Sequence, residues 1–195
     1  PAWANSLFED NAEYGYGMFL AQDTLRQRVQ KKLVELKETA KPEVVALIDK
    51  YFETANDGEA NAVATKELVC ALEACGCEKG KEIVAAKDFL TKKSVWIFGG
   101  DGWAYDIGFG GVDHVLATGE NVNIMVFDTE VYSNTGGQAS KASNIGQVAQ
   151  FAAAGKAINK KSLAEIAMSY GYVYVAQVAM GADPNQTLKA IKEAE

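Results

Sequence analysis

Short apolar runs alternate with helix-like segments in the second half of the chain. Three runs, at residues 94–98, 123–127 and 172–178, are rich in β-branched and aromatic side chains, which is typical of strands. A segment long enough for a helix follows each run, and the last begins with Asp183-Pro184, an N-cap residue and a proline at the first helical position. This repeated order predicts an α/β fold with a parallel sheet and right-handed crossovers.

Further helices are expected between these strands. One is predicted to begin near Tyr105, and the stretch around 146–154 is predicted to be helical. Residues 162–165 read Ser-Leu-Ala-Glu, the pattern of a capping box, ahead of a short helix that stops at Gly171.

The first half of the chain has a helical pattern. One face of an amphipathic helix is marked by Leu25, Val29, Leu33 and Leu36. A second helix opens at Pro42 and a third ends near Gly76, whereas residues 5–22 are apolar without a clean period and predict a helix or an irregular packed segment. We interpret the helical section, about 24–90, as an insertion on an α/β core of about 94–195, all within one domain, 1–195.

Composition narrows the possible functions. The 195 residues carry 19 basic and 26 acidic side chains, a net charge of −7, and 48% of them are hydrophobic. A chain of this size can bury a sizeable core, and its negative charge argues against nucleic acid as a partner. No apolar run approaches the roughly 20 residues that span a bilayer, and no signal peptide is visible, so no membrane is expected. Three clustered cysteines favour a reducing cytoplasm.

Both ends of the chain suggest a piece of a longer protein. The chain opens on Pro1 without an initiator methionine, and it closes on a helical pattern that reaches Glu195 without a stop signal. We therefore expect further domains in the parent protein.

Oxygen-rich turns follow the first two predicted strands. The first strand breaks into Gly-Asp-Gly at 100–102, and the second breaks into a turn that starts with Asp128-Thr129, with 25 residues between Gly102 and Asp128. Parallel strands place both turns at one edge of the sheet, where ligands bind in open α/β sheets. Asp101 can supply a carboxylate, Thr129 a hydroxyl and Val131 a carbonyl, the hard oxygen ligands that suit Mg²⁺ bridged to phosphates.

These motifs resemble a known family. Gly-Asp-Gly followed after 25 residues by a pair of small oxygen-bearing residues resembles the thiamin diphosphate signature, although Asp128-Thr129 stands where that signature usually has Asn-Asn. The departure matches one branch: Gly-Asp-Gly-Trp-Ala-Tyr-Asp-Ile-Gly and Asp-Thr-Glu-Val-Tyr-Ser-Asn-Thr-Gly-Gly-Gln resemble pyruvate:ferredoxin (flavodoxin) oxidoreductase. Residues 1–11 resemble the same family, so the likeness covers nearly the whole chain.

The resemblance implies a thiamin diphosphate-binding domain near the carboxyl end of a large, homodimeric enzyme. That enzyme decarboxylates pyruvate, passes electrons through [4Fe-4S] clusters to ferredoxin or flavodoxin, and gives the acetyl group to coenzyme A. It implies that Asp101, Thr129 and the Val131 carbonyl hold Mg²⁺, and that Asn134 also faces substrate as a catalytic residue. The implied cofactor-binding residues are Gly100, Asp101, Gly102, Trp103, Thr129, Glu130, Val131, Tyr132, Ser133 and Asn134.

Two other functions remain open at this point. An aspartate-nucleophile phosphohydrolase would use Asp128 to attack phosphorus, but it normally needs a second aspartate where Glu130 stands, and it leaves Gly-Asp-Gly unexplained. The chain could also be a folded building block without catalysis. Cys70, Cys75 and Cys77 are interpreted as structural or incidental, because a cluster needs four thiolates and none of the three matches the cluster ligands of the resembled family.

Overall fold

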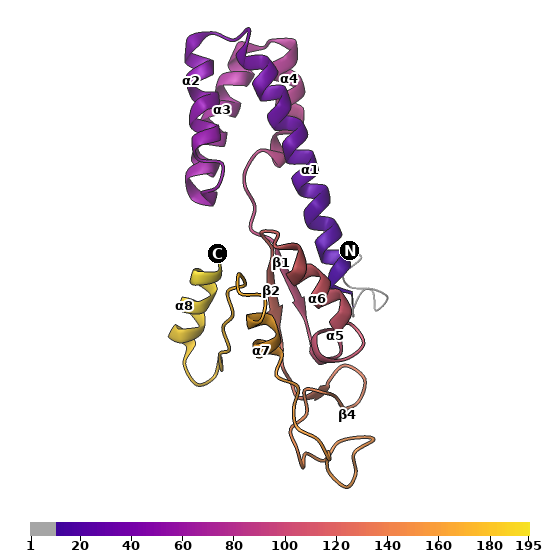
Figure 1. The fold of residues 1–195 in the computed structure, drawn as a ribbon. Coiled ribbons are helices and arrows are strands. Elements are labelled where there is room, and N and C mark those ends of the chain that lie inside the picture. Colours follow the sequence, from indigo (N-terminus) through magenta and orange to yellow (C-terminus); the bar gives the residue numbers. More distant parts are fainter. Residues whose placement is uncertain (1–10) are drawn as a thin grey trace. The chain divides into compact units, whose positions relative to one another are not determined.

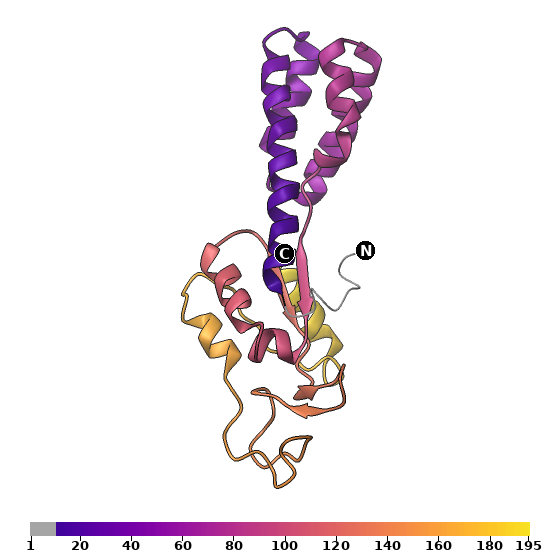
Figure 2. The same ribbon diagram turned by 90° about the vertical axis from the view of Figure 1, so that its right-hand side faces the viewer.

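The computed structural model describes residues 11–195 (Figures 1 and 2). It divides into two compact units: Met18–Ser94, and Val95–Glu195 together with the described residues up to Gly17. The boundary between Gly17 and Met18 lies within the first helix, α1 (Ala12–Lys37). No helix within residues 11–195 is long and apolar enough to cross a membrane. The family-like segment 1–11 lies almost entirely outside the described residues.

The unit Met18–Ser94 is helical. After α1 it contains α2 (Pro42–Glu53), α3 (Gly58–Cys75), α4 (Glu78–Ala85) and a 3₁₀ helix at Lys87–Phe89. Its core is one cluster of buried side chains: Val29, Leu33, Leu36, Ile48, Tyr51, Leu68, Leu72, Ile83 and Leu90. The predicted apolar face of the first helix is confirmed, and α3 ends at Gly76 in the left-handed conformation, φ 64°, as a helix C-cap requires.

A buried polar residue joins the helices of this unit. Asn61 is fully buried, and its amide group donates to the Tyr51 carbonyl at 3.2 Å. Its side-chain oxygen accepts from the Lys92 backbone N–H at 2.8 Å and from Arg26 at 3.2 Å. Because unpaired buried polar groups are costly, these bonds fix α1, α2 and α3 against the chain that leaves the unit.

The other unit contains the α/β core. β1 (Trp96–Gly99) and β2 (Asn123–Val126) pair in parallel; α5 (Asp101–Tyr105) and α6 (Phe109–Thr118) connect them. β3 (Val131–Tyr132) and β4 (Gln138–Ala139) form a small antiparallel pair, and α7 (Leu163–Met168) and α8 (Pro184–Ala194) follow. The predicted α/β class with a parallel sheet is confirmed.

The two faces of the parallel pair differ. On one face, Ile97 packs in a buried cluster with Val112 and Val115 of α6. Gly15 of α1 lies against the same strand, and a Cβ there would come within 2.9 Å of Ile97 Cγ1, which explains a glycine inside a helix. The other face carries stacked aromatic rings, with 6.0 Å between the ring centroids of Phe98 and Phe127.

Two predicted elements are absent from the described structure. Residues 172–178 form no strand, because the tyrosine hydroxyls bind neighbouring helices: Tyr172 donates to the Leu116 carbonyl at 3.2 Å, and Tyr174 to Glu193 at 2.8 Å. Residues 146–154 form no helix. Gly146 and Phe151 have φ of 77° and 65°, which a right-handed helix excludes.

Helix starts were predicted with mixed success. Asp183 caps α8 as expected, accepting from the N–H groups of Asn185 and Gln186. Ser162 precedes α7, but its side chain makes no capping hydrogen bond, so the predicted capping box is not formed. The helix expected near Tyr105 begins at Asp101 instead and ends at Tyr105.

Candidate functional site

Both motif turns lie at the carboxyl edge of the parallel pair. The register places Gly99 opposite Val126, and the Phe127 N–H donates to the Gly99 carbonyl at 2.8 Å. The strands therefore end side by side, and the next residues of each enter the turns that hold Asp101 and Thr129. The sequence spacing predicted this arrangement correctly.

The closest contact between the turns joins Asp101 and Thr129. Asp101 is the first residue of α5 and is 4% exposed. Its carboxylate accepts the Thr129 hydroxyl at 2.8 Å and the Thr129 backbone N–H at 3.2 Å from each oxygen. The same hydroxyl lies 3.1 Å from the Val131 carbonyl oxygen. Three oxygens of different chemical kinds, a carboxylate, a hydroxyl and a backbone carbonyl, thus lie together.

Burial dominates the electrostatics of Asp101. Desolvation raises the pKa of its carboxyl group, hydrogen bonds from Thr129 lower it, and the nearby Asp128 carboxylate raises it. The net direction is upward, so the ionised form is costly in the metal-free fold. A divalent cation beside this carboxylate would reverse that cost.

Asp128 has partners of its own. Its Oδ2 accepts the Tyr105 hydroxyl at 2.7 Å and lies 2.5 Å from Lys160 Nζ. Burial, and then the bond to Asp128, raise the pKa of the Tyr105 phenol. Sequence reasoning missed Tyr105 and Lys160 as neighbours of this turn. Lys160 follows the turn in a segment without a motif, so no local signal marked it.

Close packing holds the helix that carries Asp101. Trp103 is 2% exposed, and its ring lies so near Gly99 that a Cβ on the glycine would be 2.2 Å from Trp103 Cε3. A side chain at this position would therefore displace the ring and the start of α5. Of the predicted cofactor residues, Gly102 and Trp103 are buried in α5, and Gly100 is its half-buried N-cap.

The remaining predicted residues follow the second turn. Glu130 comes directly after Thr129, and Val131 and Tyr132 form β3. Ser133 and Asn134 are exposed in the connection to β4. The structure brings Asp101, Thr129 and Val131 together, whereas Ser133 and Asn134 lie further along the hairpin.

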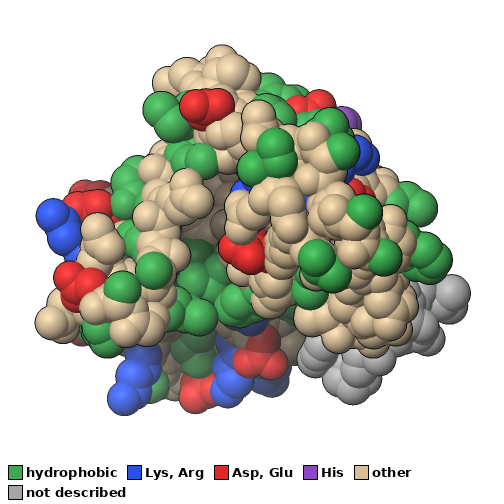
Figure 3. Space-filling model, turned by 90° about the horizontal axis from the view of Figure 1, so that it is seen from below, with side chains coloured by type: hydrophobic (Ala, Val, Ile, Leu, Met, Phe, Trp, Pro, Cys, Tyr) green, Lys and Arg blue, Asp and Glu red, His purple; other side chains and the backbone are tan. Residues whose placement is uncertain are grey.

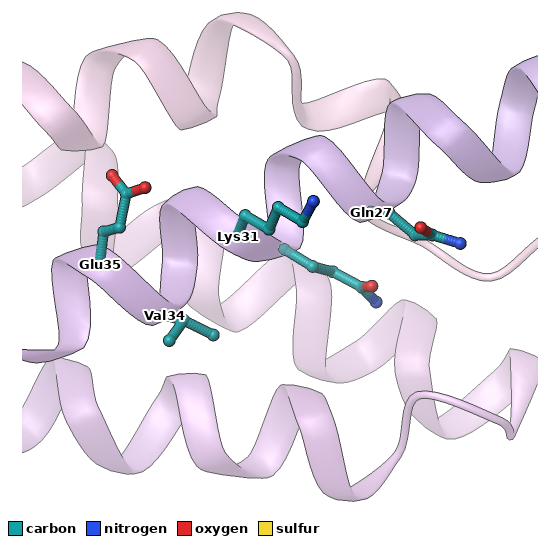
Figure 4. A pocket seen from close by; sticks show the side chains of 5 residues that line it. Gln27, Lys31, Val34 and Glu35 are labelled. Atoms are coloured by element: carbon teal, nitrogen blue, oxygen red, sulfur yellow. The ribbon is translucent and has the colours of Figure 1, made fainter.

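Loops beyond β4 form a face with exposed hydrophobic side chains, seen in green in Figure 3. They include Ile145, Val148, Phe151 and Ile158. A separate hollow of about 440 Å³ lies on α1 in the helical unit, lined by Gln27, Gln30, Lys31, Val34 and Glu35 (Figure 4). It contains none of the motif residues.

Among residues 11–195 there is no group of three His, Cys, Asp or Glu side chains that could hold a metal ion. The cradle around Thr129 is of a different kind, because a hydroxyl and a backbone carbonyl accompany its one carboxylate. Such a set suits a hard cation that takes its remaining ligands from phosphates and water.

Comparison with known proteins identifies relatives along the whole chain. Residues 74–195 match the family described as thiamine pyrophosphate enzyme, C-terminal TPP binding domain. The chain is 52% identical over 198 residues to a pyruvate-flavodoxin oxidoreductase of Klebsiella pneumoniae and 53% identical over 206 residues to a pyruvate:ferredoxin oxidoreductase of Moorella thermoacetica. Each alignment covers 100% of this chain and 17% of the relative.

A further relative has a different name. The mitochondrial pyruvate dehydrogenase [NADP(+)] of Euglena gracilis is 47% identical over 199 residues, covering 100% of this chain and 11% of the relative. The family match spans more than half of the chain and contains both motif turns. The chain therefore belongs to the thiamine pyrophosphate enzymes, within the family of their C-terminal TPP-binding domains.

Proposed function

We propose that this chain binds the diphosphate end of thiamin diphosphate through Mg²⁺, as one domain of a pyruvate oxidoreductase. The parent enzyme would release CO2 from pyruvate, give the acetyl group to coenzyme A and pass electrons through [4Fe-4S] clusters to ferredoxin or flavodoxin. The names of the relatives support pyruvate and these two acceptors. The proposal includes a cytoplasmic, homodimeric parent.

The spacing of the three oxygens around Thr129 is the observation that carries the metal assignment. Adjacent ligands of an octahedral Mg²⁺ at 2.0–2.1 Å are about 2.9 Å apart. Thr129 Oγ1 lies 2.8 Å from the Asp101 carboxylate and 3.1 Å from the Val131 carbonyl. These separations match two edges of an octahedron.

Each residue would have a defined task. Asp101 supplies the negative charge, Thr129 and Val131 supply neutral oxygens, and Gly100 and Gly102 allow the backbone to approach the phosphates. Asn134 would face the substrate. Thiamin diphosphate, when bound, supplies carbanion stabilisation, and the protein supplies orientation and electrostatics.

A phosphohydrolase is not favoured. Asp128 would be its nucleophile, yet Tyr105 and Lys160 both contact its Oδ2, and the family match independently supports the thiamin cofactor. Hydrolysis of a chromogenic phosphate ester by the purified chain would support the phosphohydrolase instead.

Substitution of the charged ligand tests the metal assignment. In the full-length protein, Asp101→Ala should abolish retention of thiamin diphosphate and Mg²⁺, while Thr129→Val should reduce it less, because water can replace a neutral hydroxyl. Bound metal and cofactor are measured after gel filtration. Asp88→Ala, at an exposed site outside the α/β unit, is the matched control. Full occupancy in Asp101→Ala would refute the assignment.

We expect the 195-residue chain alone to be inactive. By resemblance, the glutamate that activates the aminopyrimidine comes from a separate domain, and the loss of half of a shared site can cost several kcal/mol, with about 1.4 kcal/mol for each tenfold in affinity. Pyruvate-dependent reduction of a viologen dye by the chain, with cofactor, Mg²⁺ and coenzyme A supplied, would contradict this expectation.

A further inference from the structure

Glu130 has an unusual backbone conformation between two proposed magnesium ligands. Its φ is 68°, in the left-handed region that residues other than glycine rarely adopt. Thr129 precedes it and Val131 follows it, so its torsions set how the Thr129 hydroxyl and the Val131 carbonyl face each other. A residue that stabilises this conformation would control the geometry of both ligands.

Three hydrogen bonds hold Glu130. Its backbone N–H donates to Asp128 Oδ1 at 3.2 Å, and its side-chain Oε1 accepts from Asn144 Nδ2 at 2.9 Å. Its carbonyl oxygen accepts the hydroxyl of Ser143. Ser143 is fully buried, and its hydroxyl oxygen in turn accepts the Ser140 N–H at 3.0 Å, which directs its proton to Glu130.

The support for Ser143 returns to the helix that carries Asp101. Ser140 donates its hydroxyl to Asp106 Oδ2 at 2.5 Å, and the Lys141 N–H donates to Asp106 Oδ1 at 3.0 Å. Asp106 directly follows α5, which begins at Asp101. These hydrogen bonds, together with the backbone of the turn and of α5, connect Asp101 through Thr129 and Glu130 to Ser143 and Ser140, and back to the end of the same helix.

We propose that Ser143 is a positioning residue for the magnesium ligands: it holds Glu130 in the left-handed conformation so that Thr129 and Val131 face Asp101. This inference rests on the proposed function. Ser143 is not one of the proposed magnesium ligands, and its hydroxyl bonds to Glu130, so its removal should act on metal affinity through the turn. Residues that hydrogen-bond to the ligands of a metal, without binding it themselves, typically change metal affinity by about 10- to 100-fold.

The test measures the Mg²⁺ concentration that gives half-maximal retention of thiamin diphosphate by the full-length protein. Ser143→Ala should raise this concentration by about tenfold. Added to a Glu130→Gly variant, Ser143→Ala should change the concentration little relative to Glu130→Gly alone, since glycine adopts positive φ without support. Ser169→Ala is the matched control, because its hydroxyl also donates to a carbonyl, that of Ile166 at 2.6 Å, away from the turn.

The outcomes separate the two proposals. Absence of Mg²⁺-dependent retention in the unsubstituted protein, or full retention in Asp101→Ala, would overturn the proposed function. The role of Ser143 alone would be overturned if the unsubstituted protein retains the cofactor with Mg²⁺ and Asp101→Ala does not, but Ser143→Ala needs no more Mg²⁺ than the unsubstituted protein. An equally large increase when Ser143→Ala is made in the Glu130→Gly background would also overturn the role of Ser143, because that effect would not act through the Glu130 backbone conformation.

A milder variant keeps the proposal testable if Ser143→Ala does not fold. Asn144→Ala removes the exposed contact to the Glu130 carboxylate and leaves the Ser143 hydroxyl in place. It should raise the half-maximal Mg²⁺ concentration by about threefold, less than the roughly tenfold increase expected for Ser143→Ala. An unchanged value in this folded variant would count against control of the site through Glu130.

Discussion

Replacement of Asp101 by asparagine should stabilise the metal-free chain and remove its response to magnesium. The carboxyl group is 4% exposed, and burial raises its pKa, so its charge is less favourable in the fold than in water. Asparagine can still accept from the Thr129 N–H. Its NH₂ group can donate to the Thr129 hydroxyl, which can then donate to the Val131 carbonyl 3.1 Å away.

The expected gain is modest. Replacing a functional residue that itself destabilises the fold typically adds about 0.5–2 kcal/mol to the free energy of unfolding. Two charge-assisted hydrogen bonds from Thr129 become neutral and weaker, so we expect a value near the lower half of that range, about 1 kcal/mol. For a chain of this size, this corresponds to roughly 2–4 °C in melting temperature.

The gain should depend on pH. The folded-state pKa of Asp101 is raised, so the native carboxyl group contributes stability below its unfolded pKa of about 3.9 and loses that contribution as pH rises through its folded pKa. The advantage of Asp101→Asn should therefore be larger at neutral pH than at about pH 4, where it shrinks.

Urea denaturation in the presence of a chelator measures this effect. Fluorescence of the buried Trp103 beside the site reports unfolding of the α/β unit, and the measurement is made at neutral and at acidic pH. Asp88→Asn, on the exposed surface, is the control and should change nothing. A variant that is less stable than the native chain at neutral pH without metal would refute the reasoning.

Three further substitutions have defined expected outcomes. Asn61→Ala should destabilise the helical unit by about 2–4 kcal/mol, because it leaves the Lys92 N–H and the Tyr51 carbonyl without their buried partner; circular dichroism in urea measures this loss. Gly99→Ala should cost about 1–3 kcal/mol through overpacking against the Trp103 ring, visible as a shift in tryptophan fluorescence and a lower urea midpoint. Asp183→Ala should cost about 1 kcal/mol through loss of the α8 cap, whereas Asp183→Asn, which keeps the accepting oxygen, should change the midpoint little.

The features that the sequence predicts best are the pairing of the two strands and the local helix caps. Two apolar runs that end in oxygen-rich turns are sufficient to place Asp101 beside Thr129, because parallel pairing brings the carboxyl ends together. The caps at Gly76 and Asp183 were also predictable, since each depends on a local backbone conformation or a local hydrogen bond. These features depend on neighbours in sequence or on one pairing rule.

Long-range contacts account for what the sequence does not predict. The segment 172–178 has the composition of a strand, but strand preference reflects side-chain packing more than the backbone itself. Its tyrosines instead bind α6 and α8. Lys160 and Ser143 likewise reach the second turn across a loop, at positions that no periodicity or motif marks.

The separate hydrophobic cores have a consequence for cooperativity. Each unit buries its own cluster, around Tyr51 and Leu68 in one and around Trp103 and Val112 in the other. A single two-state transition is therefore not the expected behaviour on heating. Thiamin diphosphate with Mg²⁺, at a concentration high enough to overcome the affinity lost with the missing half of the site, would raise the melting temperature of the α/β unit and not that of the helical unit, because a ligand stabilises what it binds. Calorimetry with and without the cofactor would then show which transition is the unfolding of the α/β unit and which is that of the helical unit.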